Sequence, residues 1–173
     1  EVVIRPTDTK ESLLKKVRLA TILGTFQSTL VNFKYISSVW KRNCEEERLL
    51  GVSLTGIMDC NLTNGKQLSN GEKVESDALP QLLNELREMT LKTNAEFAKK
   101  IGINQSVAVT CVKPSGTVSQ LVDAASGIHA RHNPYYIRTV RGDKKDPLTK
   151  MMVDVGFPVE DDVMNPSNTS VFS

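Results

Sequence analysis

The stretch KPSGTVSQLVDAASGIH, residues 113–129, joins an apolar segment to a loop of small residues. Pro114 fixes a backbone angle and so sets a turn, and Gly116 lets a ligand approach the backbone closely. Backbone N–H groups that converge at such a turn can bind a phosphate, but the P-loop pattern G-x-x-x-x-G-K-[ST] is absent. From these residues alone a structural turn is favoured over a phosphate site. Additional hydroxyl donors at the turn are Ser115, Thr117 and Ser119.

Three segments on the N-terminal side of this turn predict strands. The residues SVAVTCV at 106–112 lead directly into the turn, and EVVI opens the chain at 1–4. The third segment, LLGVSLTGI at 49–57, is apolar at both odd and even positions. Strands that are covered on both faces have this pattern, as parallel strands under helices do. We therefore expect a buried parallel strand at 49–57.

Two long segments between these strands predict helices. The first covers 6–33, with its N-cap at one of residues 7–9, and the second covers 76–103 and ends at Gly102. Apolar residues recur at helical spacing in both, which predicts one buried face on each helix. The predicted buried face of the first helix contains Leu19, Ile22, Leu23, Phe26, Leu30 and Phe33. That of the second contains Leu79, Leu82, Leu83, Leu86, Met89, Thr93 and Phe97.

Shorter elements complete the predicted order. Residues 37–49 predict a short helix capped by a serine, and residues 59–76 predict a polar surface loop. Residues 117–125 form either a short helix or a continuing strand. Beyond them the chain predicts a strand, a helix and a strand, at 135–141, 146–156 and 169–173. This alternation predicts an α/β fold with largely parallel strands and flanking helices.

Composition excludes several classes of partner. The chain is 39% hydrophobic and 24% charged, and its net charge of +2 predicts neither nucleic acid nor a membrane surface as a partner. No apolar run approaches the roughly 20 residues that span a bilayer. Three cysteines at no metal-like spacing favour a reducing compartment, so we expect a cytoplasmic protein. Because the chain opens without Met and stops within a predicted strand, we expect an excerpt of a longer protein.

Other side chains give weaker signals for chemistry. The two histidines, His129 and His132, have no nearby third ligand, so no metal site is predicted. Their loop, 126–132, is either an ordinary loop or part of the lining of a pocket. Cys111, on the strand before the turn, predicts a small buried side chain. The basic residues near this region either attract an anion or, as favoured, form a solvated face; they are Arg131, Arg138, Arg141, Lys144 and Lys145.

Three segments together resemble a known family. They are EEERLLGVSLTGIMD at 45–59, VKPSGTVSQLVDAASGIHARHNPYYIRTVR at 112–141 and NPSNTSVFS at 165–173. In them the chain resembles the catalytic barrel of class II, adenosylcobalamin-dependent ribonucleotide reductases, most closely the monomeric type. The resemblance implies part of a ten-stranded α/β barrel, in which two parallel five-stranded halves are antiparallel to each other. Residues 1–173 would then be a partial catalytic barrel domain.

The resemblance also implies a substrate site. In this superfamily a loop binds the substrate's phosphates through backbone N–H groups, and a second loop nearby lines the nucleotide pocket. Class I relatives have an acidic residue where Gly116 stands. The matching phosphate-binding residues here are Pro114, Ser115, Gly116, Thr117, Val118 and Ser119. The matching pocket-lining residues are Ser126, Gly127, Ile128 and His129.

The implied chemistry is the conversion of ribonucleotides to deoxyribonucleotides for DNA synthesis. Adenosylcobalamin generates a cysteine thiyl radical, and a thioredoxin-like protein renews the reducing cysteines. The family's reactive cysteines lie upstream of the matching region, so no catalytic role is expected for Cys44, Cys60 or Cys111. The full-length protein is expected to be a monomer, and this segment alone to be inactive. Alternatives are a class I large subunit, which Gly116 argues against, and a non-catalytic α/β nucleotide-binding domain.

Overall fold

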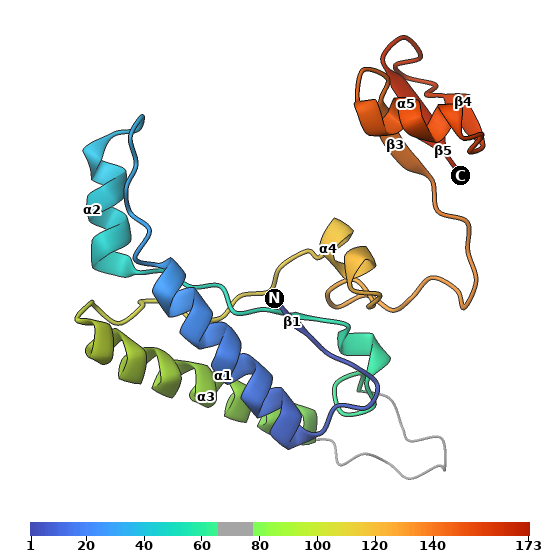
Figure 1. Ribbon diagram of the computed structural model, residues 1–173. Coiled ribbons are helices and arrows are strands. Elements are labelled where there is room, and N and C mark those ends of the chain that lie inside the picture. Colours follow the sequence, from blue (N-terminus) through green and yellow to red (C-terminus); the bar gives the residue numbers. More distant parts are fainter. Residues whose placement is uncertain (66–77) are drawn as a thin grey trace. The chain divides into compact units, whose positions relative to one another are not determined.

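The chain forms two units, which a computed structural model describes over residues 1–65 and 78–173 (Figure 1). The first unit is Glu1–Arg131 and the second is His132–Ser173. Part of the loop predicted at 59–76 lies outside the described residues. None of the helices within the described ranges is both long enough and apolar enough to cross a membrane.

Parallel strand pairing organises the first unit. Strand β1 (Val2–Val3) pairs in parallel with β2 (Leu54–Thr55), and Val52 forms a parallel bridge with Thr110. The bridge is supported by hydrogen bonds from Val52 N to the Val109 carbonyl (2.9 Å) and from Cys111 N to the Val52 carbonyl (3.1 Å). The parallel strand predicted at 49–57 is therefore confirmed, although its regular part is shorter than the sequence indicates.

Helices α1 (Lys10–Gln27) and α3 (Ala78–Ile101) pack against each other beside these strands (Figure 1). Thr9 caps α1, because its side chain accepts from Ser12 N while the Ser12 hydroxyl accepts from Thr9 N. Gly102 has φ +75° directly after α3, which confirms the predicted stop. The buried core joins strands and helices through Val2, Ile4, Leu13, Val17, Val52, Cys60, Leu82, Leu86 and Val109.

The predicted buried face of α1 is wrong. Leu23 is 70% exposed, and the helix ends at Gln27, before Leu30 and Phe33. The face that is buried has four-residue spacing and consists of Leu13, Val17, Thr21 and Thr25. The hydroxyls of Thr21 and Thr25 donate to the carbonyls of Val17 and Thr21 (2.7 and 2.8 Å), so both threonines are buried without unpaired groups.

The face predicted for α3 is partly right. Leu82, Leu86 and Thr93 are buried as expected, whereas Leu83 is 43% exposed. Asn94, which the apolar pattern omits, is also buried. Its side-chain amide donates to the hydroxyls of Thr25 (3.1 Å) and Ser106 (2.9 Å), so a polar contact joins the two helices.

The first unit also contains short helices. Helix α2 (Ser38–Glu47) is capped by the Ser37 side chain, as predicted, and has no buried residues. A 3₁₀ turn (Ile57–Asp59) follows β2. Helix α4 (Gly116–Leu121) shows that the ambiguous stretch at 117–125 begins as a helix.

The second unit has an antiparallel sheet in the order β3-β5-β4. Its strands are β3 (Val140–Asp143), β4 (Val159–Asp161) and β5 (Thr169–Phe172), and α5 (Pro147–Asp154) follows β3. The prediction of largely parallel strands is therefore wrong for this unit, and the chain as a whole has mixed sheets. The strand expected at 135–141 begins only at Val140. Strand β4 was missed because all its residues are exposed, which leaves no apolar alternation.

Asp8 makes the stability of the first unit depend on pH. Burial raises the pKa of this carboxyl, but hydrogen bonds from Lys16 Nζ, the Ser12 hydroxyl and Arg5 N outweigh burial and lower the pKa below its ordinary value. Since the folded state then binds this proton less tightly than the unfolded chain, Asp8 stabilises the fold above its ordinary pKa of about 4. That stabilisation is lost as pH falls through the lower, folded value.

We expect urea denaturation of the wild type to show a falling free energy of unfolding as the pH is lowered from about 6 to about 3. The Asp8→Asn variant should be less stable at neutral pH and should show a shallower pH dependence. Lys15→Ala, a change at an exposed position of α1 next to Lys16, is the control and should keep the wild-type slope. Identical slopes for Asp8→Asn and the wild type would contradict the assignment.

Candidate functional site

The predicted phosphate loop leads into α4, and two of its hydroxyls already have protein partners. Ser115 is 2% exposed, and its hydroxyl donates to the Glu1 carboxylate (3.2 Å). Ser119 is fully buried and donates to the Gly116 carbonyl (2.7 Å). In the structure these two hydroxyls therefore support the loop from inside, and a role of the two serines in binding phosphate stays a prediction.

The outer surface of the loop is formed by Gly116, Thr117 and Val118, which are all exposed. A Cβ atom added at Gly116 would meet no atom within 4 Å, so the space over this residue is open. N–H groups in the first turn of a helix have no acceptor within that helix. The N–H groups of these three residues therefore have no acceptor within α4, and Pro114 and Ser115 directly precede the helix.

The second predicted loop lies directly against the first. The Ser126 hydroxyl donates to the Ser115 carbonyl (2.7 Å). Gly127 has φ +55°, and a Cβ atom there would be 3.2 Å from the Lys113 carbonyl oxygen. Gly127 is buried, whereas Ile128 and His129 are exposed. The structure therefore brings the two sequence-predicted segments together, with 126–127 packed on residues 113–115.

The end of β2 holds this second loop. The Ala125 carbonyl accepts from the Thr55 hydroxyl (3.1 Å) and from Gly56 N (2.8 Å), and Gly127 N donates to the Thr55 hydroxyl (3.1 Å). The first loop follows the extended segment that is bridged at Thr110. Both loops therefore lie beyond the carboxyl ends of parallel strands, where ligands bind in α/β sheets.

An ion-pair cluster at the base of the second loop was missed by the sequence patterns. Arg131 donates to the Asp59 carboxylate through Nε (3.1 Å) and Nη2 (3.3 Å), and to the Asp123 carboxylate through Nη1 (2.9 Å). Hydrogen bonds to Asp59, and then to Asp123, raise the pKa of Arg131 above its ordinary value. Asp59 and Arg131 are 72 residues apart, so no local spacing pointed to the pair.

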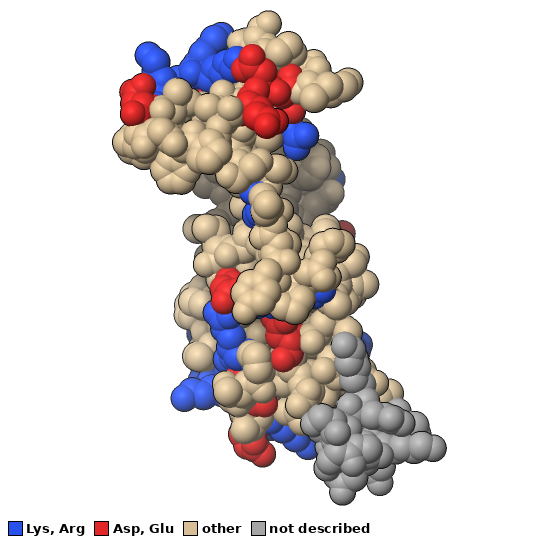
Figure 2. Space-filling model, turned by 90° about the vertical axis from the view of Figure 1, so that its right-hand side faces the viewer, with Lys and Arg blue, Asp and Glu red and all other residues tan. Residues whose placement is uncertain are grey.

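The basic residues named from the sequence are divided between the two units. Arg131 lies in the first unit and the other four in the second. Arg141 pairs with Asp162 (2.8 Å) and Lys144 with Asp161, so acidic neighbours already compensate these cations. On the face shown in Figure 2, Lys and Arg side chains lie among Asp and Glu rather than in one basic patch.

Histidine and cysteine add no metal site in residues 1–65 and 78–173. No group of three or more His, Cys, Asp or Glu in these ranges could hold an ion. His129 Nδ1 lies 3.2 Å from the Ser126 carbonyl. Cys60 is buried, but Cys111 is exposed, which contradicts the prediction of a buried side chain. Its sulfur lies beside Gly51, which has no side chain to cover it.

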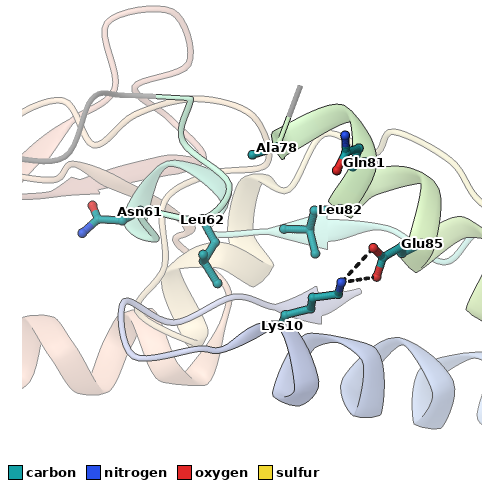
Figure 3. Close-up of a pocket in the computed structure, with 7 residues that line it drawn as sticks. All are labelled: Lys10, Asn61, Leu62, Ala78, Gln81, Leu82 and Glu85. Carbon is teal, nitrogen blue, oxygen red and sulfur yellow. Dashed lines mark hydrogen bonds and ion pairs between the residues drawn. The ribbon is translucent and has the colours of Figure 1, made fainter. Parts of the chain in front are cut away.

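A separate pocket of about 330 Å³ lies between the first turns of α1 and α3 and the turn at 61–62 (Figure 3). Leu62 and Leu82 supply apolar surface, and Lys10 and Glu85 form an ion pair (2.6 Å) across it. None of its lining residues belongs to 113–129. Among the described residues that line this pocket, the one cation, Lys10, is already paired with Glu85, so we keep the two loops as the candidate site.

Curated relatives share a family name. The chain is 30% identical over 142 residues to an adenosylcobalamin-dependent ribonucleoside-triphosphate reductase of Lactobacillus delbrueckii subsp. bulgaricus. It is 36% identical over 129 residues to a probable reductase of the same name from Dictyostelium discoideum. These alignments cover 73% and 72% of this chain, but only 19% and 15% of the relatives. No family model matches the chain.

A comparison of folds also finds a class II ribonucleotide reductase. A crystal structure of a B12-dependent (class II) ribonucleotide reductase matches with a TM-score of 0.65 and 25% sequence identity. The match covers 90% of this chain and 24% of that one. The resemblance inferred from three segments of sequence is therefore confirmed over most of the chain, and it extends to a limited part of a longer protein.

Proposed function

We propose that this chain, similar in sequence and fold to part of the class II reductases, is a segment of an adenosylcobalamin-dependent ribonucleotide reductase. Such an enzyme replaces the ribose 2′-OH of a ribonucleotide by hydrogen. The observation that carries the proposal is the similarity over most of the chain, in sequence and in fold. The strands and helices of this segment would belong to the ten-stranded α/β barrel of the complete protein.

The role proposed for this segment is to bind the phosphates of the substrate. The exposed N–H groups of Gly116, Thr117 and Val118 are the proposed donors. Pro114, Ser115 and Ser119 shape the turn, and the buried hydroxyls of Ser115 and Ser119 hold it. Ser126–His129 is the proposed wall of the nucleotide site, with Gly127 packed against the back of the loop.

The implied cofactor, adenosylcobalamin, would supply the radical chemistry of the complete enzyme. We assign no residue of this chain to the cofactor. The radical cysteine, the reducing pair and the contact with a thioredoxin-like protein would lie elsewhere in a monomeric full-length enzyme.

The phosphate role is tested by placing a negative charge over Gly116. In the full-length protein, Gly116→Glu should weaken ribonucleotide binding at least about 10-fold, roughly 1.4 kcal/mol, because the carboxylate enters the space proposed for the phosphates. Isothermal titration with a ribonucleotide measures this effect. Thr117→Ala should weaken binding less, since it keeps the backbone donor.

Gly116→Ala is the matched control for this experiment. Its methyl group meets no protein atom within 4 Å and carries no charge, so it should weaken binding less than Gly116→Glu, and the difference between the two variants measures the effect of the charge. If Gly116→Glu bound the ribonucleotide as tightly as the wild type, the phosphates would have to bind at another place.

A further inference from the structure

The side chain of Arg131 joins the two ends of the segment 123–131. Arg131 donates to both the carboxylate (2.9 Å) and the carbonyl (3.0 Å) of Asp123, eight residues earlier. Asp123 has φ +47°, a conformation that costs energy for a residue other than glycine. Its carbonyl also accepts from Arg5 Nη1 (2.7 Å), so two guanidinium groups hold this unfavourable turn in place.

Asp59 ties the closed segment to the 3₁₀ turn that follows β2. Its side chain is only 12% exposed, and it accepts from Ala125 N (2.7 Å) as well as from Arg131. A carboxylate this far from water needs such donors, and a guanidinium matches its two oxygens in one plane. One carboxylate therefore fixes the segment near its start, at Ala125, and at its end, at Arg131.

The residues held by this cluster are those that contact the candidate phosphate loop. Ser126 and Gly127 directly follow Ala125, and they bond to Ser115 and pack on Lys113. Movement of the segment would therefore move Ser115 and the donors that follow it. We infer that Asp59 and Arg131 are positioning residues for the phosphate loop, an inference that rests on the proposed function. Neither residue needs to contact the substrate.

The test uses the full-length protein with Arg131→Met, which keeps much of the side-chain length and removes all donors. We expect the Kd for a ribonucleotide, by isothermal titration, and its KM to rise about 10-fold, with kcat within about twofold of the wild type. A role confined to folding would instead lower the melting temperature and kcat without raising KM. Arg131→Lys keeps the charge but loses the planar fork, so it should raise KM by about threefold.

Arg141→Met is the matched control, because Asp162 also accepts from an arginine and from backbone N–H groups. This pair lies in the second unit, so KM should be unchanged. If the wild type binds the ribonucleotide and both Arg131 variants bind it equally well, the inference alone is overturned. A fall in kcat at constant KM in Arg131→Lys also overturns it. A wild type that binds no ribonucleotide overturns the inference together with the proposed function.

Discussion

The Gly56→Ala variant is expected to lose about 2–5 kcal/mol of the free energy of unfolding. Gly56 has φ +76°, a conformation that costs other residues about 1–2 kcal/mol. An added Cβ would also lie 2.6 Å from the Ile4 carbonyl oxygen and 3.3 Å from the Ala124 Cβ. Forcing a methyl group into packed backbone costs about 1–3 kcal/mol more. Urea denaturation of the two proteins measures the difference.

Gly102→Ala separates the two contributions to this loss. Gly102 has a similar φ of +75°, but a Cβ there would meet nothing within 4 Å. Its substitution should therefore cost only the backbone contribution of about 1–2 kcal/mol. Equal losses at Gly56 and Gly102 would show that the contact with Ile4 is relieved at no cost, which contradicts the close packing at the end of β2.

The position of Gly56 connects this stability effect to the candidate site. Ile4 N donates to the Thr55 carbonyl (2.9 Å), and Gly56 N donates to the Ala125 carbonyl (2.8 Å). A shift of the backbone at Gly56 therefore disturbs the pairing of β1 with β2 on one side and the second loop on the other. Gly56 therefore serves two purposes. It lets the end of β2 pack closely on Ile4, and its N–H group binds the second loop at Ala125.

Features with a local cause were predictable from the sequence. The doubly apolar segment at 49–57 indicated a strand in a parallel arrangement, the serine before α2 indicated a cap, and Gly102 indicated the end of α3. Each of these follows from a few adjacent residues. The adjacency of the two loops was different: it came from the family resemblance, because contacts between Ser126 and Ser115 depend on tertiary packing.

Features with a long-range cause were not predictable. The pairing of Asp59 with Arg131 joins residues 72 positions apart, and either residue alone resembles an ordinary surface charge. The antiparallel sheet of the second unit depends on how β5 lies between β3 and β4. Strand β4, which the sequence did not predict, has no buried position that a periodic pattern could detect.

The face of α1 was mispredicted for a specific chemical reason. Counting apolar residues selects Leu19, Leu23 and Phe26, whereas the buried row continues from Leu13 and Val17 through two threonines. A threonine in a helix can bond its hydroxyl to the carbonyl four residues earlier, and it then presents mainly its methyl group to the core. An apolar count treats such residues as surface positions and so assigns the wrong face.

Because the buried row of α1 runs through Leu13 and not through Leu23, truncating these two leucines should change the free energy of unfolding by very different amounts. Leu13 is fully buried, so Leu13→Ala should lower the free energy of unfolding by about 2–5 kcal/mol, from lost transfer energy and the cavity that remains. Leu23 is 70% exposed, so Leu23→Ala should stay within about 0.5 kcal/mol of the wild type. Urea denaturation of the wild type and both variants at one pH measures these two differences.

The comparison is informative because residue type, substitution and helix are the same, so helix propensity cancels and burial is what differs. A large loss at Leu13 alone would place the core on the row that continues through Thr21 and Thr25. Similar large losses at both positions would mean that Leu23 is covered in the protein under test, as the apolar spacing predicted. A small loss at Leu13 would contradict the packing of α1 on α3 and the strands, because a fully buried leucine cannot be truncated there without leaving a cavity.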